Sequence, residues 1–246
     1  MDATIAALAA AQIPPARMTL AVVTGEPVAL EAYVATYGSI ILALEGGQAA
    51  GTGFADVLLG AVSPSGMTPF TMYKAGFVDE VKMSDMTLRP NATTGSKGKT
   101  YRFYSGDVNW PFGHGLSYTT FTMAWGSTMP PAGGVSAATL QSDGVTVSVD
   151  VTNTGAVRSM KIVALYVSTP DVDGSPLRTL VALDKIDLAP GAKQTVVLKT
   201  NAVVGICAFC LFDDAGAASV PVGTKYVLDV GDGGKAFFPA ATVVAK

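Results

Sequence analysis

The sequence has few charged residues, a single histidine and no long apolar run. Charged residues make up 14% of the 246 residues, against about 25% in a typical soluble domain. The formal net charge is −3 and no basic block is present, so we expect neither nucleic acid nor a membrane as partner. No run reaches the roughly 18 apolar residues of a transmembrane helix. Hydrophobic residues nevertheless make up 49%, which indicates either a β-rich protein or apolar surface that a partner domain covers.

Cysteine is also scarce, since Cys207 and Cys210 are the only two. A lone C-x2-C pair offers two ligands where structural zinc takes four, so we expect no metal site, and nothing else indicates a cofactor. The apolar neighbours of the pair predict an extended strand over Cys207–Phe212. Residues three apart on a strand face opposite sides, so we expect two separate thiols, buried or half-buried.

Helix and strand signals alternate in the first part of the chain. Apolar runs predict strands over Met18–Val23 and Ser39–Leu44. Helical stretches are predicted over Ala3–Ala11, Val28–Thr36 and Gly51–Leu59. This order is typical of a parallel sheet with helices on its faces, and the continuous apolar strands fit burial on both faces.

The remainder of the chain changes character twice. Residues 61–118 are rich in Pro, Gly, Ser, Thr and aromatic residues, and they predict a long ordered excursion across a surface. From Phe121 onward the pattern is all-β, with Val145–Val151 alternating at period two. Further strands are predicted at Ile162–Val167, Leu177–Leu188, Thr195–Leu198, Cys207–Phe212 and Lys225–Val230. The fold class is therefore multi-domain α+β, with a partial parallel-sheet α/β part followed by an all-β sandwich.

Three segments, in chain order, resemble a known family. They are Gly46–Tyr73 (GGQAAGTGFADVLLGAVSPSGMTPFTMY), Gly98–Phe121 (GKTYRFYSGDVNWPFGHGLSYTTF) and Val149–Pro170 (VDVTNTGAVRSMKIVALYVSTP). The first two resemble signature segments of family 3 glycoside hydrolases. The third resembles the start of the fibronectin type III-like domain that ends many of these enzymes. Met83–Gly106 and Asp213–Asp232 are similar to the plant and fungal β-xylosidase branch.

The resemblance implies a division into three parts. Residues 1–75 would be a truncated α/β sandwich domain, residues 76–120 a linking excursion, and residues 121–246 a fibronectin type III-like β-sandwich. The resemblance implies that the family's nucleophile lies in the missing (β/α)8 barrel and that its acid/base lies in a region upstream of where this chain begins. Neither carboxylate has a counterpart here, so the resemblance implies a C-terminal fragment that is inactive alone, because retaining hydrolysis needs both groups about 5–5.5 Å apart.

The resemblance also implies partners and a location. The expected ligand is a xylan-type carbohydrate, and the missing barrel is an expected partner. The parent family is extracellular, although Asp2 and the lack of Lys or Arg before the first apolar run argue against a signal peptide. The alternative function is a non-catalytic module that binds polysaccharide or another protein.

No residue is assigned a catalytic role, and three are candidates for substrate binding. Glu45 follows a strand, at the end where ligands bind in open α/β sheets. His114 lies in the turn-rich PFGHGLSYT segment without a nucleophile motif, which favours a structural role. Trp110 belongs to an aromatic stretch that could stack on sugars, although anchoring of the excursion to both neighbouring parts is favoured. Glu26 precedes a predicted helix, where the helix dipole would stabilise a carboxylate.

Overall fold

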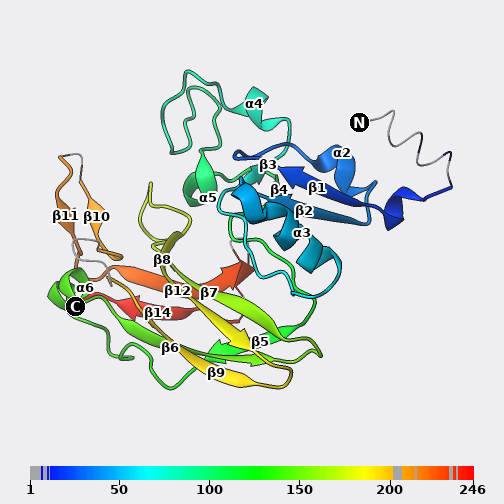
Figure 1. Ribbon diagram of the computed structural model, residues 1–246. Helices are drawn as coiled ribbons and strands as arrows, with labels where there is room; N and C mark the ends of the chain where they lie inside the picture. The colour runs from blue at the N-terminus through cyan, green and yellow to red at the C-terminus, as the bar shows by residue number, and fades with distance from the viewer. Residues whose placement is uncertain are drawn as a thin grey trace.

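In the computed structural model the chain forms an N-terminal α/β part, an excursion over residues 61–118 with little regular structure, and a C-terminal β-sandwich (Figure 1). The structure describes residues 7, 10, 12–201, 207–213, 215–232, 235–236 and 238–246. The helix predicted over Ala3–Ala11 lies outside the described residues, apart from residues 7 and 10. Within the described part, no helix is long and apolar enough to cross a membrane.

Two parallel strands, β1 (Thr19–Val23) and β2 (Ser39–Ala43), form the sheet of the α/β part. Around them lie η1 (Pro15–Arg17), α2 (Glu31–Val34), η2 (Gly47–Ala49) and α3 (Ala50–Leu58). The predicted alternation of strands and helices is confirmed from β1 to α3. Gly60, at φ 75°, follows the last turn of α3. The helix predicted over Val28–Thr36 is only the single turn α2, and so short a helix gains little from cooperativity.

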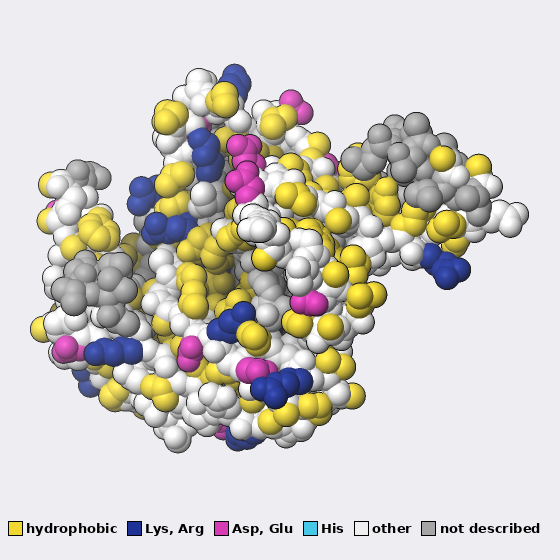
Figure 2. All heavy atoms as spheres, viewed as in Figure 1, with side chains coloured by type: hydrophobic (Ala, Val, Ile, Leu, Met, Phe, Trp, Pro, Cys, Tyr) yellow, Lys and Arg dark blue, Asp and Glu magenta, His cyan; other side chains and the backbone are white. Residues whose placement is uncertain are grey.

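The strands of this small sheet are not buried. Every residue of β1 and β2 is exposed or half-buried. Up to residue 62, Leu30 is the only buried hydrophobic residue among those the structure describes. The prediction of strands buried on both faces is wrong for this structure, because a two-stranded sheet with short helices cannot cover both of its faces. Figure 2 shows hydrophobic side chains on the surface over this part of the molecule.

The excursion folds around a short antiparallel pair of strands. β3 (Met72–Tyr73) pairs with β4 (Val108–Trp110), although they lie far apart in the sequence. Two single helical turns lie between them, α4 (Phe77–Glu80) and α5 (Thr100–Phe103). This strand pair therefore holds the two ends of the excursion together.

The C-terminal part is a sandwich of two antiparallel sheets. One has three strands in the order β5-β6-β9, and the other has five, in the order β13-β12-β7-β8 with β14 also paired to β12. The bounds are β5 (Phe121–Trp125), β6 (Thr146–Asn153), β7 (Ser159–Ser168), β8 (Thr179–Leu188), β9 (Lys193–Lys199), β12 (Lys225–Asp232), β13 (Lys235–Ala236) and β14 (Ala241–Val244). A helix, α6 (Ala137–Ser142), and a small hairpin, β10 (Leu211–Phe212) with β11 (Ala218–Ser219), flank the sheets.

The main hydrophobic core lies between these two sheets. The period-two alternation of β6 buries Val147, Val149 and Val151 completely. They pack in one cluster with residues of the opposite sheet such as Val163 and Leu228. All buried members of this cluster lie between residues 140 and 245, so the sandwich carries the core that the described α/β part lacks.

The prediction for the two cysteines is wrong. Cys207 and Cys210 form a disulfide, with Cα atoms 5.4 Å apart. The strand predicted over Cys207–Phe212 begins only at Leu211, and a turn occupies the preceding residues. In a turn, unlike in a strand, residues three apart approach each other, so the thiols meet. Phe209 at the tip of this turn is buried against Tyr226, with ring centroids 5.1 Å apart.

Candidate functional site

Two motif segments that are distant in sequence meet around Thr68. The Thr68 amide donates to the His114 carbonyl at 2.8 Å, and the Gly113 amide donates to the Thr68 carbonyl at 2.8 Å. The Thr68 hydroxyl donates to the Pro111 carbonyl at 2.8 Å and accepts from the His114 amide at 3.1 Å. The PSGMT and PFGHG segments therefore hold each other through one threonine.

This close approach requires glycine. A Cβ atom at Gly115 would collide with the Gly66 carbonyl oxygen, and Gly113 adopts φ 81°, which side chains disfavour. Beside it, the hydroxyls of Ser63 and Ser117 lie 3.0 Å apart, and that of Ser117 lies 3.1 Å from Ser159 on β7. The two segments thus form a joint between the excursion and the sandwich.

The structure brings two of the three sequence candidates together. The rings of Trp110 and His114 stack with their centroids 6.3 Å apart and an interplanar angle of 21°. Trp110 lies on β4 opposite Met72 of β3, and His114 follows in the Thr68 joint. Glu45 instead lies past the end of β2, where its carboxylate would be 3.2 Å from a Cβ atom placed on Gly25. It is exposed at the carboxyl ends of the two parallel strands.

The expectation for Glu26 needs correction. The helix α2 begins at Glu31, so Glu26 does not lie at a helix start. Instead its backbone closes a small turn: its amide donates to the Thr24 hydroxyl at 3.1 Å, and that hydroxyl donates to the Glu26 carbonyl at 3.0 Å.

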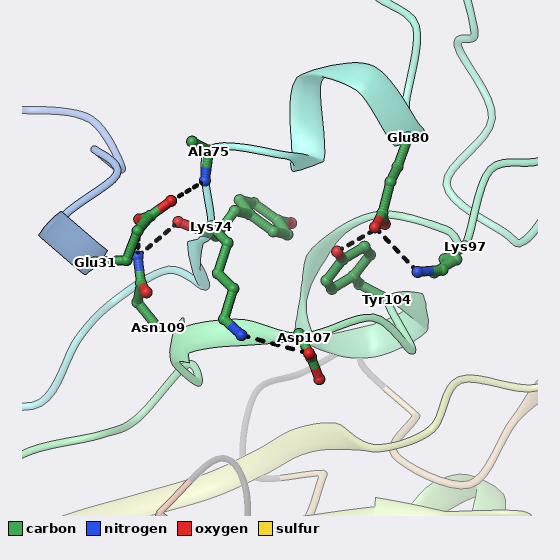
Figure 3. Close-up of polar contacts among 9 residues, drawn as sticks. Glu31, Lys74, Ala75, Glu80, Lys97, Tyr104, Asp107 and Asn109 are labelled. Carbon is green, nitrogen blue, oxygen red and sulfur yellow. Dashed lines mark hydrogen bonds and ion pairs between the residues drawn. The ribbon is translucent and has the colours of Figure 1, made fainter.

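A network of carboxylates that the sequence did not single out links α2 to the excursion (Figure 3). Glu31 accepts from the Ala75 amide at 2.6 Å and from the Asn109 side-chain amide at 2.8 Å. Asn109 also donates to the Tyr73 carbonyl at 3.1 Å. The hydrogen bond from Asn109, followed by that from Ala75, lowers the pKa of Glu31. Figure 3 also shows Lys74 reaching toward Asp107, an exposed ion pair at 3.4 Å.

The second half of this network centres on Glu80. Lys97 pairs with one carboxylate oxygen at 3.0 Å, and the Tyr104 hydroxyl donates to the other at 3.0 Å (Figure 3). These two hydrogen bonds, Lys97 first, lower the pKa of Glu80. Burial, and then the hydrogen bond to Glu80, raise the pKa of Tyr104 to about 12. The Tyr104 ring also meets the stacked rings of Tyr73 and Phe77 edge-on.

These carboxylates are suited to holding segments together rather than to acid catalysis. A general acid for glycoside hydrolysis needs a raised pKa, and Glu31 and Glu80 have lowered ones. Burial raises the pKa of Asp229, but this carboxyl lies on β12 opposite Tyr166 of β7, 3.9 Å from Arg178. Among the described residues, no group of three or more His, Cys, Asp or Glu side chains is placed to hold a metal ion.

A cavity of about 370 Å³ opens where the excursion meets the sandwich. Arg89, Arg102 and Phe103 line it from the excursion, and the loop before β8 lines it from the sandwich. Arg89 Nε donates to the Gly174 carbonyl of that loop at 2.9 Å. Arg89 and Arg102 both lie in the Met83–Gly106 segment. They meet the loop before β8 only because the excursion packs against the sandwich.

The comparisons with known proteins agree on one family. Residues 1–118 match the family described as the glycosyl hydrolase family 3 C-terminal domain. The exo-1,4-beta-xylosidase bxlB of Emericella nidulans is 40% identical over 169 residues, which cover 65% of this chain and 22% of that protein. Beta-D-xylosidase 1 of Arabidopsis thaliana is 32% identical over 219 residues, covering 79% of this chain and 28% of that protein. This chain thus spans about a quarter of the length of these curated relatives.

Solved structures match this chain over both its α/β part and its sandwich. The GH3 exo-beta-xylosidase XlnD, solved with a xylobiose aziridine activity-based probe, superposes with a TM-score of 0.79 at 25% identity. That match covers 98% of this chain and 32% of the other. The beta-D-glucoside glucohydrolase of Trichoderma reesei, at 23% identity and a TM-score of 0.76, shares the fold over 99% of this chain and 35% of its own.

Proposed function

We propose that this chain, which belongs to glycoside hydrolase family 3 as a C-terminal part similar to the β-xylosidases, is the non-catalytic portion of an enzyme that hydrolyses xylan-type β-xylosides. The family implies a carbohydrate substrate and a catalytic domain beyond the residues present here. Xylose is the sugar favoured, because the curated relatives named above are β-xylosidases. In this proposal the chain supports and completes the catalytic part and supplies neither catalytic carboxylate.

The observation that carries the proposal is the uncovered parallel sheet. Parallel sheets are normally covered on both faces, whereas β1 and β2 have no buried residue. Val23 at the end of β1 is 63% exposed, and Leu58 and Leu59 of the α3 region are 52% and 84% exposed. Covering this apolar surface with a catalytic part would remove it from water, which is favourable in proportion to the area buried.

The first test is activity of the chain alone. We expect the purified chain to give no turnover of an aryl β-xyloside, because in this proposal it supplies neither the nucleophile nor the acid/base carboxylate that the reaction needs. The assay should include Glu45→Gln, since Glu45 is the candidate that lies where α/β sheets bind ligands. Robust turnover that Glu45→Gln abolishes would overturn the proposal.

The second test asks whether the exposed sheet is a contact surface for a catalytic part. In a chimaera, the chain would replace the matching segment of the Emericella nidulans exo-1,4-beta-xylosidase, and xyloside turnover would be measured. We expect Val23→Asp to reduce turnover at least tenfold, because it would bury an unpaired charge. The control is Val197→Asp on β9, which is equally exposed at 61% but lies on the sandwich. Equal effects of the two substitutions would count against the proposed contact.

The relatives do not favour the alternative of a free-standing polysaccharide-binding module, because the proteins that contain the matching stretch are named as xylosidases. Retention of the isolated chain on insoluble xylan, with no gain of function on adding a catalytic part, would reverse this preference.

A further inference from the structure

We infer that the cavity between the excursion and the sandwich is a binding site for an acidic sugar, with Arg89 and Arg102 receiving its carboxylate. The cavity holds about 370 Å³, within the size range of small-molecule sites. Its walls come from segments far apart in sequence, so the site exists only in the folded chain. None of its lining residues belongs to the Thr68 joint or to the Glu31 and Glu80 networks.

The charge of the cavity indicates an anionic ligand. Neither Arg89 nor Arg102 forms an ion pair with a carboxylate among the described residues, although the chain as a whole is acidic. Both guanidinium groups lie over the Phe103 ring, with their central carbons 5.3 and 5.6 Å from its centroid. Asp173 is the one carboxylate among the described lining residues, and it accepts from the Gly174 amide at 2.9 Å. Figure 2 shows Lys and Arg side chains gathered around this part of the surface.

Arg102 provides the most specific indication. Its Nε atom is buried and has no hydrogen-bond partner in the described structure. A buried donor without a partner costs free energy, and a ligand acceptor would recover it if the guanidinium turns toward the cavity that the residue lines. The backbone of this residue is held in place, because the Leu177 amide donates to the Arg102 carbonyl at 2.7 Å and the adjacent Phe103 is buried. A guanidinium on a backbone held in this way suits a carboxylate, to which it can donate two parallel hydrogen bonds.

The remaining lining suits the rest of a sugar. The hydroxyls of Ser168, Thr169 and Thr179 belong to residues that line the cavity and could bond sugar hydroxyls. Phe212 lines the same cavity and is 67% exposed, so its ring is available to pack against a sugar face. The choice of a sugar rests on family membership, and not on the proposal that a complete enzyme hydrolyses xylosides. The ligand class is therefore a uronate, free or as a branch on a polysaccharide.

The test measures binding of D-glucuronate to the whole chain by isothermal titration calorimetry. We expect saturable binding that Arg102→Gln weakens at least tenfold and Arg89→Gln weakens to a smaller extent, with Arg102→Lys intermediate. The matched control is Arg158→Gln, which removes an exposed arginine that already pairs with Asp187 at 2.8 Å and should leave binding unchanged. Thermal unfolding of each variant checks that lost binding is not lost folding.

Two further ligands separate the contribution of the carboxylate to binding from that of the sugar ring. D-Glucose, which lacks the carboxylate, should not bind, and inorganic phosphate, which lacks the sugar, should bind more weakly than glucuronate. No saturable glucuronate binding, unchanged binding in folded Arg102→Gln, or phosphate binding as tight as glucuronate would each overturn the inference. An inactive chimaera with intact glucuronate binding would count against the proposed function alone, and an active chimaera without it would count against this site alone.

Discussion

Asn153 is a single buried side chain that ties three segments together. Its amide oxygen accepts from the Thr119 hydroxyl at 2.7 Å and the Gly155 amide at 3.1 Å. Its amide nitrogen donates to the carbonyls of Val157 at 2.8 Å and Leu188 at 3.0 Å. Every hydrogen-bonding group of this side chain is satisfied at zero exposure, so its removal leaves two buried and two partly buried groups without partners.

We expect Asn153→Ala to lower the free energy of unfolding by about 3 kcal/mol, since each orphaned buried group costs roughly 1–3 kcal/mol and part of the loss relaxes. Chemical denaturation of the chain would measure it. Thr154→Ala, which removes an exposed hydroxyl bonded to Thr120, should stay within about 0.5 kcal/mol. A comparable loss in both variants would contradict the role given to Asn153.

Asp85 makes the excursion sensitive to acid. Its carboxylate accepts from the Thr87 amide at 2.9 Å and from the hydroxyls of Thr87 at 2.6 Å and Thr94 at 2.7 Å. These bonds, the Thr87 hydroxyl first, lower the pKa of Asp85 to about 2. A lowered pKa means that the stabilisation is complete above the unfolded value of about 3.9 and is lost as the pH falls toward 2.

We therefore expect amides of residues 85–99 to lose protection from hydrogen exchange between about pH 4 and pH 2, after correction for the intrinsic rates. Asp85→Asn should give lower protection at neutral pH and no such loss on acidification, because an amide does not titrate. The same acid-induced loss in the variant would show that another group is responsible.

At the scale of elements, the joint between the two motif segments depends on Gly115, where the backbones approach most closely. We expect Gly115→Ala to destabilise the chain by about 3 kcal/mol, because the new methyl would collide with the Gly66 backbone, which cannot yield as a side chain would. Thermal and chemical unfolding would measure the change.

Gly76→Ala is the matched control for this prediction. Gly76 precedes α4 with φ −63°, and nothing lies within 4 Å of its added Cβ. This substitution should be neutral or slightly stabilising, because it restricts the unfolded chain without strain in the folded one. Equal destabilisation by both substitutions would mean that collision with the Gly66 backbone does not cause the effect of Gly115→Ala.

Local sequence predicted elements well where a single pattern decided the structure. The alternation in β6 and the apolar runs of β1 and β2 placed these strands within one or two residues. The pattern failed at Cys207 and Cys210, where apolar neighbours suggested a strand although packing of Phe209 against Tyr226 bends the chain into a turn. Of the candidate site residues, sequence drew attention to Trp110 and His114, but not to their stacking on each other.

On the scale of the whole molecule, stability should be unevenly distributed. The buried cluster lies entirely within residues 140–245, whereas β1 and β2 contribute no buried residue. We expect limited proteolysis to degrade the α/β part first and to release a stable piece that starts near residue 120, because local opening is easiest where few apolar groups are buried. Mass spectrometry of the products would locate the cut.

The opposite order of cleavage, with loss of the C-terminal half before the first sixty or so residues, would contradict this distribution. In the chimaera the α/β part should resist proteolysis better than it does in the chain alone, because a catalytic part would cover the exposed sheet.

By itself the sequence determined the family, the α+β class and the order of most elements, because these follow from local periodicity, turn residues and short contiguous motifs. Tertiary structure alone decided which distant groups meet: Thr68 with the PFGHG turn, Glu31 with Asn109, the two cysteines with each other, and Arg89 with Arg102 over Phe103. Such contacts depend on how the excursion packs on both neighbouring parts, and no local pattern encodes that packing. For the same physical reason the cavity and its unpartnered arginine could be found only in the folded chain.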